Sequence, residues 1–143
     1  MKDKNCAYCM REEKPELYQA FGYYVKDLRV SSLYIFREQS HPGRCIVAYK
    51  DHVSEMVDLT KEEREAFLAD ICDVANAIHE AYHPDKLNYG FYGDKGKHIH
   101  CHLCPKYKDG FEWGSVFQMN PHKEDKSDEE LKEVADKILK YLK

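Results

Sequence analysis

The sequence predicts an α+β domain with a mostly antiparallel five-stranded sheet, one long central helix and a C-terminal helix. Short segments rich in Tyr, Phe, Val, Leu and Ile outnumber the segments with helical periodicity and cluster around them along the chain. The 143 residues contain no internal repeat, no low-complexity tract and no linker rich in Pro, Gly or Ser. A chain of this length and uniformity is expected to form a single domain over residues 1–143.

Five segments have the composition of β-strands. A polar break near Asp27 separates the first two, and the Pro42-Gly43 turn precedes the third. Residues 93–96, Gly-Asp-Lys-Gly, form the turn between the last two. The predicted strands are residues 18–28, 31–38, 45–49, 87–92 and 97–105.

Two helices are predicted, each from a capping box followed by apolar residues at helical spacing. Thr60, with a glutamate three residues later, begins the long helix, and Pro84 ends its pattern. Ser127 and Glu130 form the second box, which begins a helix over about 127–142. The apolar residues of the long helix are Phe67, Ile71, Val74, Ile78 and Tyr82.

Composition and charge exclude several classes of protein. The hydrophobic fraction of 43% with 34% charged residues is ordinary for a globular domain and unlike that of a disordered chain. The formal net charge of −4 argues against a general nucleic-acid binder. No apolar run approaches the roughly 18 residues of a membrane span, and residues 1–5 lead into no apolar stretch. We expect a cytoplasmic protein that binds neither nucleic acid nor membrane.

The run at residues 98–103, His-Ile-His-Cys-His-Leu, carries the strongest chemical signal. In a strand, alternate side chains share one face, so the three imidazoles are predicted to lie together, with rings about 6.6 Å apart along the strand. The intervening apolar residues then face the core. Imidazole can be a nucleophile, a proton carrier, a hydrogen-bond donor or a metal ligand near neutral pH. A histidine with a free ring nitrogen is a competent nucleophile towards phosphorus.

This run, with Pro-Lys-Tyr at 105–107, resembles the signature of the histidine triad family. Residues 43–53 resemble the family's strand followed by a histidine, and residues 59–60 begin a helix where the family has one. Residues 87–89, Leu-Asn-Tyr, resemble its asparagine-bearing strand. The resemblance implies the α+β histidine triad domain, a homodimer, and hydrolysis or transfer at the α-phosphorus of a nucleotide. Nucleoside phosphoramidates, dinucleoside polyphosphates and related adenylates are the implied substrates.

By the same resemblance, His100 is the nucleophile, and His102 and Asn88 contact the phosphate and support the attack. Many family members carry a longer loop with Gln and Ser donors before the triad, whereas this chain has only Gly-Asp-Lys-Gly-Lys at 93–97. Glu38 is the candidate for the acidic residue that binds ribose. Trp113, in the polar loop after the triad, is a candidate contact for the substrate or for a second subunit.

Cys6 and Cys9 have the two-residue spacing of a zinc knuckle, within a polar N-terminal segment 1–14 that lacks the strand and helix of a redox site. Some triad-family members, and the related galactose-1-phosphate uridylyltransferases, hold zinc with such a pair plus two histidines. The matching positions here are His52 and His98. The resemblance therefore implies one structural zinc per chain.

Other cysteines and histidines are weaker candidates. Cys101 and Cys104 also have the two-residue spacing, but their thiols diverge in a regular strand; a four-cysteine ribbon built from both pairs is the rival arrangement. The remaining thiols are expected to pack in the interior, and four further histidines are expected to end helices or lie in loops. These residues are Cys45, Cys72, His79, His83, His41 and His122.

Two further classes of function stay open beside the nucleotide enzyme. One is a nucleotide-binding regulatory module with little turnover, because ground-state binding and catalysis use the same donors. The other is a zinc-stabilised interaction domain, which predicts metal content without nucleotide affinity. Turnover of an adenosine phosphoramidate, measured beside simple AMP affinity, discriminates between them.

Overall fold

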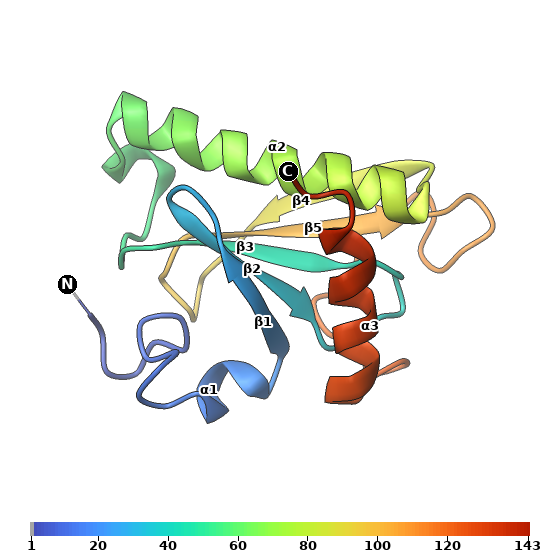
Figure 1. Cartoon of the computed structure of the whole chain (residues 1–143), viewed down its shortest axis with the longest axis horizontal. Helices are drawn as coiled ribbons and strands as arrows, with labels where there is room; N and C mark the ends of the chain where they lie inside the picture. The colour runs from blue at the N-terminus through green and yellow to red at the C-terminus, as the bar shows by residue number, and fades with distance from the viewer. Residues whose placement is uncertain (1) are drawn as a thin grey trace.

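A computed structural model describes residues 2–143 and contains one five-stranded antiparallel sheet with strand order β1-β2-β3-β5-β4 (Figure 1). The long helix and the C-terminal helix predicted from the sequence are both present, so the predicted fold class is confirmed. In the described part of the chain, no helix has the length and apolar character of a membrane span. The elements are α1 (Glu16–Gln19), β1 (Gly22–Asp27), β2 (Ser31–Phe36), β3 (Cys45–Tyr49), η1 (Met56–Asp58), α2 (Lys61–Tyr82), β4 (Lys86–Phe91), β5 (His100–Lys106) and α3 (Asp128–Leu139).

The strand predicted at 18–28 is wrong at its start. The chain forms the short helix α1 after Pro15, and the Phe21 amide donates to the Tyr18 carbonyl at 3.0 Å before β1 begins. Tyr18 packs edge-on against Tyr34 of β2, with ring centroids 5.4 Å apart. An aromatic-rich segment indicates burial against a neighbour, and here tertiary packing holds those rings without a strand backbone.

Two other strand boundaries also differ from the prediction. The strand predicted at 31–38 ends at Phe36, because the Gln39 amide pairs with the Glu124 carbonyl at 2.9 Å instead of continuing the ladder. The strand predicted at 97–105 is β5, which begins only at His100. His98 precedes it, and the Ile99 amide donates to the Val53 carbonyl at 2.7 Å.

Both capping boxes form as predicted. Thr60 accepts from the Glu63 amide at the start of α2, and Ser127 accepts from the Glu130 amide at the start of α3. His83, with a left-handed φ of 50°, caps the end of α2 before Pro84.

Cys72 corrects one prediction about burial. Its side chain is exposed rather than packed in the interior, although Ile71 and Val74 beside it are buried. Successive residues on a helix are rotated by about 100°, so a cysteine next to a core position in sequence points away from the core.

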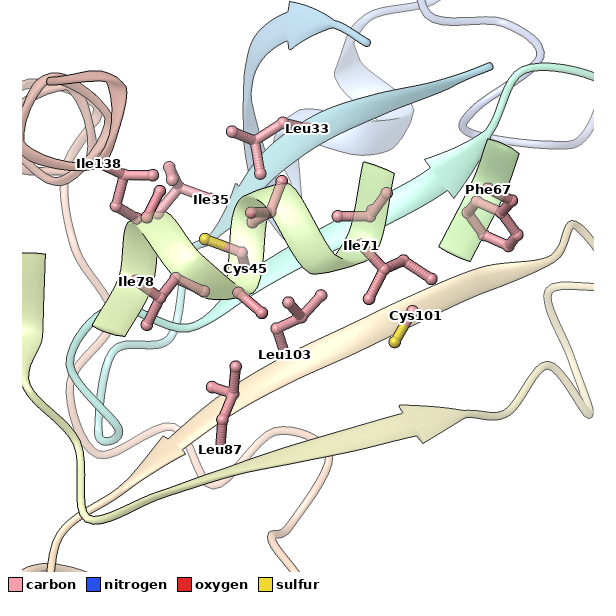
Figure 2. Packing of buried hydrophobic residues seen from close by; sticks show 14 of the residues in the cluster. Leu33, Ile35, Cys45, Phe67, Ile71, Ile78, Leu87, Cys101, Leu103 and Ile138 are labelled. Carbon is pink, nitrogen blue, oxygen red and sulfur yellow. The ribbon is translucent and has the colours of Figure 1, made fainter. Parts of the chain in front are cut away.

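The hydrophobic core lies between one face of the sheet and the helices α2 and α3. Figure 2 shows Leu33, Cys45, Cys101 and Leu103 of the sheet directed towards Ile71 and Ile78 of α2. Residues at alternate positions of β5 therefore project to the opposite face. The N-terminal segment 2–14 and α1 lie on the side of the sheet away from α2 (Figure 1).

Candidate active site and metal site

The histidine row lies on the face of the sheet opposite the core. His100 and His102 belong to β5, which is hydrogen-bonded to β3 on one side and β4 on the other. Their ring centroids are 5.3 Å apart, while Cys101 and Leu103 join the core as predicted. His98 lies just before the strand, and Tyr8 contacts both His98 and His100, with ring centroids 5.2 and 5.3 Å away.

The tautomer of His100 follows from its hydrogen bond. Its Nδ1 lies 2.6 Å from the carbonyl oxygen of His98, and a carbonyl can only accept, so Nδ1 carries the proton and donates. In the neutral ring, Nε2 then holds a free lone pair. Burial lowers the pKa of His100, which is only 9% exposed, and so favours the neutral form. The neutral ring therefore presents an unprotonated Nε2.

Three aromatic rings from other parts of the chain surround the imidazole of His102. Phe36, Tyr92 and Phe117 have ring centroids 5.6 to 6.2 Å from the imidazole. Gly90 lies opposite His102 on β4, and a side chain there would collide with the Tyr92 ring and approach Phe117 to 3.0 Å. Glycine at this position thus allows the rings to close over the histidine.

The charge state of His102 predicts a pH dependence of stability. Burial, then the Arg44 guanidinium, lowers its pKa to about 3 in the folded protein, against about 6.5 in the unfolded chain. Between these values the unfolded chain binds a proton that the folded protein does not. The free energy of unfolding therefore falls as the pH decreases from 6.5, by about 1.4 kcal/mol per pH unit for this group.

Substituting His102→Asn isolates this contribution, because the amide oxygen can occupy the position of Nδ1 and does not titrate. The free energy of unfolding is measured by urea at pH 7, 6, 5 and 4. It is expected to fall less steeply with decreasing pH in the variant than in the wild type, and the difference in slope corresponds to up to one proton taken up on unfolding. Equal slopes for the two proteins would contradict the assigned pKa of His102.

Asn88 lies on the same face as the histidines. It pairs with Cys104 of β5, and its neighbour on that face, Gly90, pairs with His102. Directly opposed residues of an antiparallel pair share a face. The Asn88 side chain therefore lies on the same face as His102, and the Asn88–Cys104 pair is the next pair on that face after Gly90–His102. The side chain of Asn88 is half-buried, and its amide has no hydrogen-bond partner among residues 2–143.

Glu38 is placed differently from the expectation that it contacts ribose. Its buried carboxylate accepts from the hydroxyl and amide of Ser40 and from the amides of Lys123 and Glu124, at 2.7 to 2.9 Å. These bonds lower its pKa against the opposing effect of burial. With its acceptor sites used in this way, Glu38 anchors the loop 107–126 to the end of β2, and we assign it no substrate contact.

The loop 107–126 after β5 carries Trp113, which is 43% exposed and thus accessible to a ligand or a second subunit. The loop is held by buried polar side chains that sequence reasoning missed. Lys106 donates to the Glu112 and Ser115 carbonyls at 2.5 and 2.6 Å. His41, expected in a loop without a role, is buried and lies 2.8 Å from the Glu112 carboxylate.

Cys6, Cys9, His52 and His98 come together as the resemblance implied, with one ligand atom from each residue within 4.8 Å of the others. The Cys6 thiol is 3.4 Å from Nδ1 of His98, and the Cys9 thiol is 3.3 Å from Nδ1 of His52. Nε2 of His98 lies 2.5 Å from the Tyr49 carbonyl, so the proton is on Nε2 and the Nδ1 lone pair faces the thiols. Two thiols and two imidazoles with a backbone partner behind one ring are the donor set of a tetrahedral zinc site.

The rival cysteine pair does not form a site. Cys101 points into the core, and Cys104 lies on the other face of β5, opposite Asn88. Both are buried, and neither belongs to the cluster around Cys6. A ribbon with four cysteine ligands is therefore incompatible with this structure.

Comparison with known proteins agrees with these features. A family model described as the HIT domain matches residues 26–109. The "Protein hit" of Bacillus subtilis (strain 168) is 28% identical over 105 residues, which are 70% of this chain and 71% of that protein.

Solved structures share the fold. A histidine triad (HIT) protein from Sinorhizobium meliloti 1021 has a TM-score of 0.81 at 19% identity, covering 89% of this chain and 94% of that one. A hypothetical histidine triad nucleotide-binding protein from Sulfolobus tokodaii strain7 has a TM-score of 0.71 at 15% identity, covering 96% and 91%. Because the family model spans more than half of the chain, this protein belongs to the histidine triad (HIT) family.

Proposed function

We propose that this protein is a nucleotide hydrolase or nucleotidyl transferase that acts at an α-phosphorus through His100. The observation that supports this most directly is the bond from Nδ1 of His100 to the His98 carbonyl, which leaves Nε2 as a lone-pair donor. Nucleotide binding is also named for the relative from Sulfolobus tokodaii strain7. Nucleoside phosphoramidates, dinucleoside polyphosphates and related adenylates are the proposed substrates.

In the proposed reaction, Nε2 of His100 attacks the α-phosphorus and forms a P–N bond. The bond from phosphorus to the leaving group breaks, and the leaving group departs with that electron pair and takes a proton from solvent. Water then attacks the same phosphorus, the P–N electron pair returns to Nε2, and the proton lost by water passes to solvent. Hydrogen-bond donors on two adjacent strands, His102 on β5 and the side-chain amide of Asn88 on β4, hold the phosphoryl oxygens.

A screen of nucleotide conjugates followed by ³¹P NMR tests the function and identifies leaving group and product together. We expect a nucleoside monophosphate as product from at least one phosphoramidate, polyphosphate or adenylate. AMP affinity without turnover of any of them would support a regulatory binding module instead. Zinc content with neither affinity nor turnover would support an interaction domain.

We further propose that the Cys6, Cys9, His52 and His98 cluster holds one structural zinc per chain. Bound there, zinc would tie the N-terminal segment to the residue that precedes β5. Burial raises the pKa of the Cys6 thiol to about 11, and a divalent cation would favour the thiolate that ligation requires. Such a thiol-rich site, with six unpaired cysteines in the chain, fits the reducing cytoplasm.

We also propose that the protein is a homodimer, and strand β4 is the surface that supports this. It lies at the edge of the sheet, so its outer backbone groups have no strand beside them within residues 2–143. Tyr89 and Phe91 pair with the core-facing residues Leu103 and Cys101, yet they are 51% and 42% exposed. A second copy of β4 would pair with this edge and cover both rings.

Light scattering at micromolar concentration is expected to report about twice the chain mass of 16.9 kDa. The double substitution Tyr89→Glu and Phe91→Glu should shift the protein to monomer, because charge on a buried strand edge opposes pairing. Val116→Glu, at an exposed loop position, is the matched control and should leave the mass unchanged. A wild-type monomer under these conditions would contradict the proposal.

A further inference from the structure

We propose that Arg44 is a positioning residue that fixes the tautomer of His102, so that Nε2–H of His102 is the donor offered to the substrate. This inference rests on the proposed function for its catalytic consequence, but the tautomer itself is a property of the free protein. Arg44 lies immediately before β3, and its contacts are separate from those of the metal-ligand cluster.

The guanidinium of Arg44 is held rigidly and without access to water. The residue is 0% exposed, and its guanidinium carbon lies 4.1 Å from the Phe36 ring centroid and 4.8 Å from that of Phe117. Its Nη1 donates to the Gln118 carbonyl at 3.1 Å, and its Nη2 donates to the Met119 carbonyl at 3.0 Å. Two rings and two carbonyls thus define the plane and the direction of the fork.

The same Nη2 lies 3.4 Å from Nδ1 of His102. A guanidinium carries only N–H donors, so the histidine nitrogen that faces it must be the acceptor. Nδ1 of His102 is therefore unprotonated, and the single proton of the neutral ring is on Nε2. His100 has the opposite assignment, with its proton on Nδ1, because its partner is a carbonyl instead of a guanidinium.

The two neighbouring imidazoles consequently have complementary roles. His100 presents a lone pair to an electrophile, and His102 presents an N–H to an oxygen bound to that electrophile. Arg44 also keeps the His102 ring neutral, because a second positive charge beside a buried guanidinium is strongly disfavoured. His102 then acts as a fixed neutral hydrogen-bond donor rather than as an imidazolium acid.

The energetic position of Arg44 supports a role beyond stability. It makes no salt bridge within the described residues, and its buried Nε–H has no hydrogen-bond partner there. A buried cation with an unsatisfied donor contributes less to stability than an apolar side chain of similar volume would. What the buried guanidinium does provide is its contact with His102 and its hydrogen bonds to the two loop carbonyls.

A purely structural role, in which Arg44 only holds the loop 107–126, has a matched control in Lys106. This buried lysine donates to the Glu112 and Ser115 carbonyls of the same loop. None of its hydrogen bonds reaches a histidine. Lys106→Met therefore weakens the loop anchor and leaves the contact between Arg44 and His102 in place.

The test uses the full chain with ¹⁵N-labelled histidine, and the His102 signals are assigned by their loss in His102→Asn. Long-range ¹H–¹⁵N spectra distinguish a protonated from an unprotonated ring nitrogen. In the wild-type protein at pH 7 we expect His102 as the Nε2–H tautomer. An Nδ1–H tautomer in the wild type would overturn the inference, whatever the activity of the protein.

Arg44→Met supplies the second readout. Arg44 and His100 are the titratable groups that lower the pKa of His102 through their charge. Burial, the larger cause of the low pKa, stays in place when Arg44 is removed, but the charge of Arg44 is lost, so Arg44→Met should raise the protonation midpoint of His102 and Lys106→Met should not. Arg44→Lys retains the charge without the planar fork, and it should keep a low midpoint. Equal midpoints in Arg44→Met and the wild type would contradict the inference.

Turnover provides the third readout, on whichever conjugate the substrate screen identifies. Arg44→Met should lower kcat about 10²-fold, as expected for a misplaced transition-state donor, with KM within a few-fold of the wild type. Arg44→Lys should be intermediate, and Lys106→Met should lose less than Arg44→Met. If no conjugate is turned over, the proposed function fails while the tautomer and titration results still decide this inference.

Discussion

His100→Asn is expected to reduce turnover at least ~10⁴-fold while AMP affinity stays within a few-fold of the wild type. Removing the proposed nucleophile raises the barrier without removing the proposed ground-state contacts of Asn88 and His102. Asparagine is the appropriate replacement because its amide N–H can still donate to the His98 carbonyl that now accepts from Nδ1. The variant should therefore melt near the wild-type temperature.

A trapped intermediate gives a direct measurement of the same step. Rapid quench with a slow substrate should add the mass of one nucleoside monophosphate to the peptide that contains His100. His98→Ala serves as the contrast. It removes one of the four proposed metal ligands and also the hydrogen bond from the His98 ring to the Tyr49 carbonyl. It should lose stability and rate together. Wild-type turnover in His100→Asn, or an adduct on another residue, would refute the proposed mechanism.

Replacing both Cys6 and Cys9 by Ser is expected to have the largest effect on stability. The purified wild-type protein should contain about one zinc per chain by elemental analysis. The double variant should contain almost none and should melt roughly 10 °C lower or more, because metal-binding energy is partly folding energy. A chelator should lower the melting temperature of the wild type towards that of the variant.

Cys72→Ser is the matched control, since Cys72 is an exposed thiol outside the cluster. It should keep both the zinc content and the melting temperature of the wild type. Full metal content in the Cys6 and Cys9 double variant would disprove the proposed ligand set. An unchanged melting temperature in a metal-free double variant would disprove the structural role of the metal.

Sequence reasoning succeeded where the relevant interaction is local. The capping boxes at Thr60 and Ser127 place the starts of α2 and α3 correctly, because donor and acceptor are three residues apart. The two faces of β5 follow from the alternation of His and apolar residues over a few positions. Tyr18 shows the limit: its aromatic character indicates burial, but it does not determine whether the backbone is helix or strand.

Contacts between distant segments could not be predicted from patterns alone. Cys6 and His98 are 92 residues apart, and only the family resemblance placed them in one site. The sequence around Glu38 suggests a ribose contact, because nothing near it along the chain shows the amides of Lys123 and Glu124 that its carboxylate binds. Arg44 was missed for the same reason, since its burial depends on Phe117 and on carbonyls more than 70 residues away.

The span of the cysteine and histidine cluster also determines when it can assemble in a growing chain. Cys9 and His98 are separated by 89 residues, and a ribosome adding roughly 5–20 residues per second needs about 4 to 18 s to cover that interval. During this time the thiols of Cys6 and Cys9 have already been made, but the His98 imidazole that later faces them has not. Cys9 therefore reaches its final position only long after it is made, and the rate of translation sets the shortest time to a complete site.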